Sequence, residues 1–216
     1  MISLVPDDDR LDVLCLGAHP DDIEIGCGGT LLGLTQRPRT TVTGLVLTGS
    51  DERRKEAEAA LPRFFPDASL KVVDLPDGRL PTHWNDVKDA LEHVASLCHP
   101  TLIFAPRPDD AHQDHRLLGR LASTVWRDAL ILHYEIPKWD GDLITPSHYV
   151  RLSEGQARQK VHLLNTCFPS QANRHWWDEE LFLGLMRLRG VEIRTHYAEG
   201  FVAGKVALRL AGRDTT

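Results

Sequence analysis

The sequence predicts a single Rossmann-like α/β domain, with a mostly parallel sheet and helices on both faces. Segments typical of strands and of helices alternate through the first 135 residues, a pattern that predicts parallel strands joined by crossover helices. The 216 residues, 42% of them hydrophobic and 26% charged, suit one globular domain with its own core. The chain has no Gly/Ser linker, repeat or low-complexity tract. We therefore expect one domain over residues 1–216, with a core over about 11–203.

The first third of the chain begins this alternation. Residues 11–18 form an apolar run that predicts the first strand, and residues 28–34 predict the following helix. Residues 41–48 are β-branched and apolar, as in a second strand. The charged residues 51–61 are strong helix formers, and residues 70–74 predict a short third strand. We expect these strands to lie side by side in one sheet.

The middle of the chain continues in the same way. Residues 86–97 space their valines and leucines so that these share one face of a helix. Residues 101–105 predict a fourth, buried strand. A helix over residues 114–126 and a fifth strand over residues 129–134 follow. Together with the first third, these segments predict the parallel part of the sheet.

The last third differs in pattern. Ser153 and Gln156 have the spacing of a capping box, which predicts a helix that runs to about residue 164. A second helix over residues 179–189 is followed by Gly190, a typical stop signal. Residues 191–202 are expected to be extended. We expect these pieces to complete the same domain.

Composition excludes several classes of function. The net charge of −6 argues against a nucleic-acid partner, because phosphate binding requires clustered Lys and Arg. No apolar run approaches the roughly 18 residues of a membrane span, and the first ten residues lack the basic start and apolar core of a signal peptide. The four cysteines are widely separated, which favours reduced thiols in a cytoplasmic protein.

Two short clusters of histidine and aspartate follow predicted strands. The first strand is followed by Ala18-His19-Pro20-Asp21-Asp22, and the fourth by His112-Gln113-Asp114-His115. In the common doubly wound strand order, these two strands are neighbours at the point where the winding reverses, and ligands bind in the crevice at their carboxyl ends. We therefore expect the two clusters to face each other across that crevice.

The residue types in these clusters suit hydrolysis assisted by a metal ion. His19 and Asp22 are three residues apart and can both turn inward, and the two histidines of the second cluster have the same spacing. Two imidazoles and one carboxylate leave a coordination position open for water, as in a catalytic zinc site. The ion lowers the pKa of bound water to about 7 and polarises a carbonyl oxygen. A spare carboxylate can take the water's proton, and a spare cationic imidazole flanked by Asp110 and Asp114 can stabilise an oxyanion.

Two other interpretations are weaker. Gly26-Cys27-Gly28-Gly29 follows a strand, but Leu31 stands where a dinucleotide-binding motif requires its third glycine or alanine. Close backbone packing explains these glycines better. A set of two histidines and one carboxylate also serves non-haem iron oxygenases, although the additional Asp21 and His112 favour proton transfer.

The sequence resembles the PIG-L/LmbE-like family of zinc-dependent N-acetylglucosaminyl N-deacetylases. Residues 18–22 match the family signature A-H-P-D-D-E, and residues 112–115 match its H-x-D-H signature. The resemblance extends from about residue 11 to residue 202. Its further matches are Arg-x-x-Glu at residues 53–56, Asp77, Ser170-Gln171 and Tyr-Ala-Glu-Gly-Phe at residues 197–201.

The resemblance implies a role for each site residue. The implied ligands of zinc, or of Fe²⁺ or another divalent ion, are His19, Asp22 and His115. Asp21 would be the general base, and His112 would stabilise the oxyanion. Arg53 and Asp77 fall where family members contact the sugar. The implied reaction removes the acetyl group from an N-acetylglucosamine-type sugar in a small glycoside or conjugate, and trimers or hexamers are frequent in the family.

Two departures and two alternatives accompany this resemblance. Ile23 replaces the Glu that closes the first signature, with Glu24 one place later, and Asp110 stands where some members carry a Tyr. One alternative is another metal-dependent amidase or esterase without a sugar preference. The other is a non-catalytic metal- or sugar-binding module, which would have no need for Asp21 beside a complete ligand set.

Overall fold

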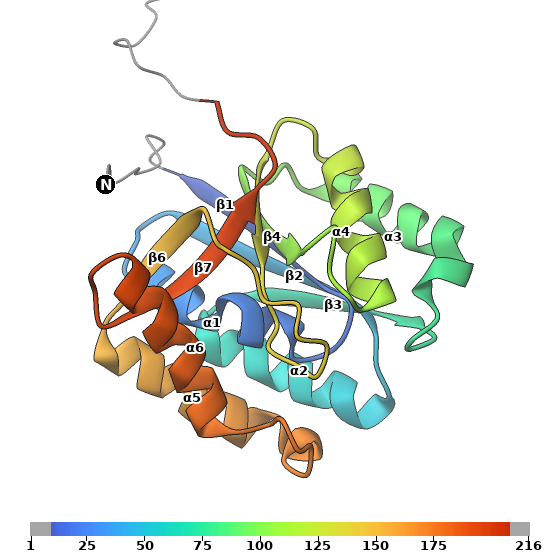
Figure 1. Cartoon of the computed structure of the whole chain (residues 1–216). Coiled ribbons are helices and arrows are strands. Elements are labelled where there is room, and N and C mark those ends of the chain that lie inside the picture. Colours follow the sequence, from blue (N-terminus) through green and yellow to red (C-terminus); the bar gives the residue numbers. More distant parts are fainter. Residues whose placement is uncertain (1–9, 208–216) are drawn as a thin grey trace, which may run out of the picture.

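A computed structural model describes residues 10–207, which form a seven-stranded sheet in the order β3-β2-β1-β4-β5-β7-β6 (Figure 1). The parallel strands are β1 (Leu11–Gly17), β2 (Thr40–Thr48), β3 (Ser69–Leu75), β4 (Leu102–Pro106) and β5 (Leu130–Tyr134). β7 (Tyr197–Ala203) is antiparallel to β5, and the edge strand β6 (His148–Leu152) is antiparallel to β7. The predicted α/β fold with a mostly parallel sheet is confirmed.

Helices cover both faces of the sheet (Figure 1). One face carries α1 (Asp22–Leu34), α2 (Asp51–Phe64), α5 (Glu154–Cys167) and α6 (Glu179–Glu192), and the other carries α3 (Trp84–Leu97) and α4 (Gln113–Val125). Two short 3₁₀ helices, η1 (Leu80–His83) and η2 (Pro169–Gln171), lie in the connections. Each face has its own apolar core, one that includes Leu31, Leu61 and Leu164, and another that includes Leu91 and Leu118.

The strand order reverses between β1 and β4. From β1 the chain winds outward through β2 and β3, and it then returns to place β4 and β5 on the other side of β1. The loops after β1 and β4 therefore lie at one carboxyl edge, where the connecting helices diverge and leave room for a ligand. This topology brings together two clusters separated by about ninety residues of sequence.

Helix α1 begins earlier than we predicted, at Asp22, and it contains a break. Cys27 has non-helical angles (φ −141°, ψ 15°), so the predicted start at residue 28 corresponds to the second segment of this helix. A Cβ atom added to Gly26 would lie 2.4 Å from the Tyr134 ring, and one added to Gly28 would lie 2.7 Å from the Phe64 ring. Close packing thus explains both glycines, as the sequence indicated.

The last predicted segment also needed correction. We expected residues 191–202 to be extended, but α6 continues to Glu192 and β7 begins only at Tyr197. Gly190 does not stop the helix. A Cβ at this position would lie 2.4 Å from the carbonyl oxygen of His196, so glycine permits the returning chain to pass against α6. Strand β6 was also absent from our prediction.

A buried ion pair bridges the break in α1. The Glu199 carboxylate accepts hydrogen bonds from the backbone N–H of Gly29 (2.8 Å) and of Thr30 (2.7 Å), and therefore caps the second segment of the helix. The Lys160 ammonium group donates to Glu199 (2.7 Å) and to the carbonyl oxygen of Ile25 (2.6 Å) in the first segment. Lys160 and Glu199 are 3% and 4% exposed, so each buried charge is neutralised by the other.

Residues 10–207 form no helix with both the length and the apolar composition that a bilayer crossing requires.

We predict that Glu199→Ala lowers the free energy of unfolding by about 3–5 kcal/mol, because it leaves the Lys160 charge buried without a partner. Urea denaturation of the purified protein measures this change. Glu154→Ala is the control, because it removes a pair with Arg158 that lies on the surface, and it is expected to leave the unfolding midpoint unchanged. Equal midpoints for the two variants would contradict the bridging role of Glu199.

Candidate metal centre

The loop after β1 is shaped by the side chain of Asp22. Its Oδ2 atom accepts hydrogen bonds from the backbone N–H groups of Ala18 and His19, both at 2.9 Å. The preceding residue, Asp21, has a left-handed φ of 95°, which is rare for a residue other than glycine. The neighbouring carboxylates consequently have different partners, since Asp21 pairs with Arg53 and Asp22 with His115.

Three buried donor groups converge at the crevice. The His19 Nδ1 atom lies 3.1 Å from His115 Nε2 and 3.6 Å from Asp22 Oδ2, and His115 Nε2 lies 3.2 Å from Asp22 Oδ1. Two ligands bound to one tetrahedral ion at 2.0–2.1 Å lie roughly 3.3 Å apart. The donor types and their separations therefore fit a divalent metal ion.

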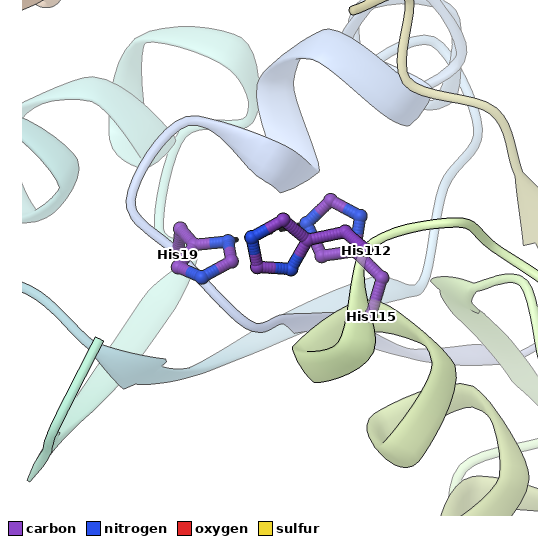
Figure 2. Close-up of side chains that lie close together, drawn as sticks. All are labelled: His19, His112 and His115. Carbon is purple, nitrogen blue, oxygen red and sulfur yellow. Dashed lines mark hydrogen bonds between the residues drawn. The ribbon is translucent and has the colours of Figure 1, made fainter. Parts of the chain in front are cut away.

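His112 lies beside this set. Figure 2 shows its ring close to those of His19 and His115, and nitrogen atoms of the three rings lie within 4.8 Å of one another. The Nδ1 atom of His112 accepts a hydrogen bond from the backbone N–H of Asp114 (3.3 Å) and thereby caps α4. This contact leaves Nε2 as the nitrogen that carries hydrogen in a neutral ring, and it occupies one of the two nitrogens that could bind a metal.

Each inward-facing histidine has a carboxylate behind it. The outer nitrogen of His19, Nε2, lies 3.3 Å from Asp114 Oδ2 and 3.1 Å from Asp77 Oδ1. The outer nitrogen of His115, Nδ1, lies 3.3 Å from Asp110 Oδ1. Metal-binding histidines typically have such a carboxylate partner, which sets the orientation of the ring and makes it more basic.

These carboxylates also fix the surrounding loops. Asp114 is fully buried and accepts hydrogen bonds from the backbone N–H groups of Gly78 (2.8 Å) and Leu80 (3.1 Å), which hold the loop after β3. Asp110 accepts from the backbone N–H of His112 (2.8 Å) and pairs with Lys138 at 3.1 Å. Lys138 was missed in the sequence, because a lysine in a loop carries no signal of a buried partner.

The two adjacent aspartates titrate differently. Burial raises the pKa of Asp21 to about 7, although the charge of Arg53 opposes this effect. Burial would also raise the pKa of Asp22, but the charges and hydrogen bonds of His115 and His19 together hold it well below its usual range. Asp22 is therefore ionised at neutral pH, whereas Asp21 exchanges a proton near neutrality.

The centre favours positive charge. Burial lowers the pKa of His115, but the carboxylates of Asp22 and Asp110 outweigh burial and raise this pKa to about 9. The pKa of His19 is likewise well above its usual value, because hydrogen bonds to Asp114, Asp22 and Asp77 outweigh burial. In the protein without a metal, protons on these two histidines supply the positive charge, and a bound cation can supply it in their place.

The expected cationic form of His112 is not supported. Burial and the positive charges of His115 and His19 lower the pKa of His112. A neutral imidazole whose Nδ1 accepts from the backbone still presents Nε2–H as a hydrogen-bond donor. We therefore correct the expected charge of this ring, while its capacity to donate a hydrogen bond remains.

Arg53 and Asp77 both reach the centre. The Arg53 guanidinium donates to Asp21 Oδ2 (2.9 Å) and to the carbonyl oxygen of Pro20 (2.5 Å), so it supports the loop that carries the aspartates. The Asp77 side chain touches His19, yet it is 61% exposed and open to a ligand. One turn after Arg53, Glu56 accepts hydrogen bonds from the backbone N–H and hydroxyl of Ser170, so two further matching motifs are in contact.

The change in the first signature has a structural explanation. Ile23 is 1% exposed and packs in the core beneath the sheet, where a carboxylate would be unfavourable. Glu24 is 2% exposed, and burial raises its pKa to about 8. The chain thus keeps a buried carboxyl group near the centre, one position later than in the signature and mostly protonated at neutral pH.

Comparison with known proteins identifies the family of this chain. Residues 14–126, more than half of the chain, match the family model described as PIG-L: GlcNAc-PI de-N-acetylase. "Uncharacterized deacetylase YaiS" of Escherichia coli (strain K12) is 29% identical over 140 residues, which cover 59% of this chain and 75% of that protein. Diacetylchitobiose deacetylase of Thermococcus kodakarensis is 30% identical over 132 residues, which cover 54% of this chain and 49% of that protein.

A solved structure shows the same fold. The N,N'-diacetylchitobiose deacetylase from Pyrococcus horikoshii superposes with a TM-score of 0.72 and 22% sequence identity, over 90% of this chain and 84% of that chain. The family match and the curated relatives, which are named as deacetylases, give the same answer as the paired signatures. The chain belongs to the PIG-L family and is a deacetylase.

Proposed function

We propose that this protein hydrolyses the acetamide of an N-acetylglucosamine-type sugar in a small glycoside or conjugate, with a divalent ion held by His19, Asp22 and His115. The main support is the convergence of three buried donors at separations of 3.1–3.6 Å, each histidine having a carboxylate behind it. Zinc suits this donor set, and Fe²⁺ is the alternative. Bound there, such an ion would activate water and polarise the acetyl carbonyl group.

In this proposal Asp21 is the general base. It is 5% exposed and its pKa is raised to about 7, close to the value at which a side chain both accepts and returns a proton efficiently at neutral pH. Its contact with Arg53 sets the orientation of the carboxylate. Asp21 accepts a proton from the attacking water and then delivers it to the amine nitrogen as the C–N bond breaks, so the products are acetate and the free amino sugar.

His112 stabilises the negative charge that develops on the acetyl oxygen. Its Nδ1 atom is occupied by the backbone N–H of Asp114, so Nε2–H can point at the reacting group as a fixed donor. A donor held in place before the reaction needs no rearrangement in the transition state. The neutral ring provides this stabilisation through the hydrogen bond, without a positive charge of its own.

The N-acetyl sugar is proposed from the relatives and from two side chains. The family model is described as a GlcNAc-PI de-N-acetylase, and two of the similar proteins are named as diacetylchitobiose deacetylases. Arg53 and the exposed Asp77 lie next to the donor set. Charged groups with several hydrogen-bonding atoms suit sugar hydroxyls, because a missing hydroxyl leaves them unpaired.

We predict that the purified protein carries about one divalent ion per chain. Elemental analysis is expected to show loss of this ion in His19→Ala and in His115→Ala, because each removes one of three ligands. His83→Ala serves as the control, since His83 pairs with Asp86 at the surface. Full metal occupancy in both ligand variants would rule out this assignment.

The adjacent aspartates give a second prediction. Asp21→Asn is expected to retain the metal and to lose roughly 10²–10⁴-fold in kcat, the usual effect of removing a general base. Asp22→Asn is expected to lose the metal itself. Metal content and turnover measured on the same preparations separate the two effects. Turnover of Asp21→Asn near the wild-type rate would place the base elsewhere.

The sugar preference is tested with two acetamides. We predict that kcat/KM for an N-acetylglucosamine glycoside exceeds that for an acyclic N-acetyl amine, and that Asp77→Ala reduces this preference while the metal content is unchanged. An acetate-release assay measures both rates. Equal rates of the wild-type protein on the two compounds would favour a general metal-dependent amidase.

A further inference from the structure

The segment between β5 and β6, residues 135–147, is held by hydrogen bonds beside the proposed metal centre. In the core, the Arg189 guanidinium forms two hydrogen bonds with the Glu135 carboxylate (2.7 and 2.8 Å) and a third with the carbonyl oxygen of Ile144 (2.9 Å). Arg189 and Glu135 are each 4% exposed. One buried arginine therefore fixes both ends of the segment.

The middle of this segment is tied to the loop after β4. The Asp142 carboxylate accepts a hydrogen bond from the backbone N–H of Ala111 (2.8 Å). The backbone carbonyl oxygen of Asp142 accepts another from the Arg107 guanidinium (2.6 Å). Lys138 joins Asp142 (2.9 Å) to Asp110 (3.1 Å), and Asp110 lies 3.3 Å from His115. Residue 139 directly follows Lys138, whose side chain pairs with Asp110. Asp110 in turn contacts the proposed metal ligand His115.

Residue 139 is Trp139, which is 67% exposed. Its ring meets that of Trp176 edge to face, with ring centroids 6.2 Å apart and an interplanar angle of 82°. Trp176 is half-buried and contacts the buried rings of Trp177 (5.5 Å) and Phe182 (6.5 Å). Trp139 therefore has firm aromatic support on one side and is open to solvent on the other.

The second tryptophan also belongs to a segment tied to the centre. Trp176 follows η2, and Ser170 in η2 is bound by Glu56 of α2. The same helix carries Arg53, which contacts Asp21. Figure 1 shows the two connections that carry the tryptophans, the one between β5 and β6 and the one between α5 and α6. Both are anchored to helices or loops that hold the proposed site.

The surroundings of Trp139 indicate the kind of ligand. An exposed, pre-positioned indole offers a large apolar face at low entropic cost. Its neighbours along the chain, Lys138, Asp140 and Asp142, are charged, and the Asp140 side chain is 44% exposed. Lys138 and Asp142 already pair with each other, but an acyl chain on the indole would bury the exposed Asp140 carboxylate unfavourably. A pyranose ring matches both features, because it has an apolar C–H face and hydroxyl groups around its edge.

We propose that Trp139, supported by Trp176, binds a second sugar ring, the one joined to the N-acetyl sugar whose acetamide lies at the metal centre. This inference rests on the proposed function and extends it from a single amino sugar to at least a disaccharide. Trp139 is then a residue that determines specificity for the part of the substrate that does not react.

The test compares two substrates of different length. We expect Trp139→Ala to lower the ratio of kcat/KM for N,N'-diacetylchitobiose to that for N-acetylglucosamine by about five- to tenfold, the scale of one aromatic contact. Trp139→Phe is expected to restore most of the ratio. Leu97→Ala is the control, because Leu97 is 71% exposed and ends α3, which lies on the face of the sheet opposite to α5 and α6. An unchanged ratio in Trp139→Ala, with both sugars still hydrolysed, would overturn the second-ring site and leave the proposed deacetylation intact.

If the wild-type protein hydrolyses neither sugar, this outcome counts against the proposed function. A binding measurement then tests the second-ring site separately. The indole N–H signal of Trp139 in ¹⁵N-labelled protein is identified by its absence in Trp139→Phe. We expect this signal to shift on titration with N,N'-diacetylchitobiose and to shift much less with N-acetylglucosamine. A signal that responds to neither sugar would refute the second-ring site independently of turnover.

Discussion

The carboxylate of Asp22 is the contact on which the site depends. One of its oxygens closes the loop after β1 through the backbone N–H groups of Ala18 and His19, and the other faces His115 of α4. It thus joins the two loops that the reversal of the strand order brings together. The negative charge of Asp22 also favours the binding of a cation there, since the carboxylates of Asp22, Asp110 and Asp114 contact the two imidazoles. Shaping of the loop and preference for a positive charge follow from the same side chain.

Two buried ion pairs stabilise the segments that border this site. The Lys160–Glu199 pair bridges the break in α1, whose first segment begins at Asp22. The Arg189–Glu135 pair fixes the segment that carries Lys138 and Trp139. Buried ion pairs contribute little net stability compared with apolar packing, but losing one partner is costly. These pairs lie in the two segments that border the centre. We interpret them as pairs that fix the position of these segments, at the cost of burying charge.

Much of the fold and the core of the site were predictable from local patterns. Apolar runs identified β1 and β4, and the clusters that follow them, with His19 and His115, gave the correct meeting point once the usual strand order was assumed. The start of α1 was missed because its first turn contains Asp22, which also shapes the loop after β1. The break at Cys27 is bridged by Lys160 and Glu199, which lie far along the chain. Lys138 and Arg189 were missed for a related reason, since the acidic partners of a lysine or arginine are chosen by tertiary structure. The neutral state of His112 depends on charges that only the assembled site brings near it.

The central claim is that two imidazoles and the carboxylate of Asp22 bind one divalent ion. X-ray absorption at the zinc edge of the zinc-loaded protein tests it most directly, because imidazole rings and sulfur ligands give distinct scattering. We predict two imidazole nitrogens and oxygen donors at about 2.0–2.1 Å, with one imidazole fewer when His115 is replaced by alanine. A sulfur ligand at about 2.3 Å, or a spectrum without imidazole scattering, would contradict the account.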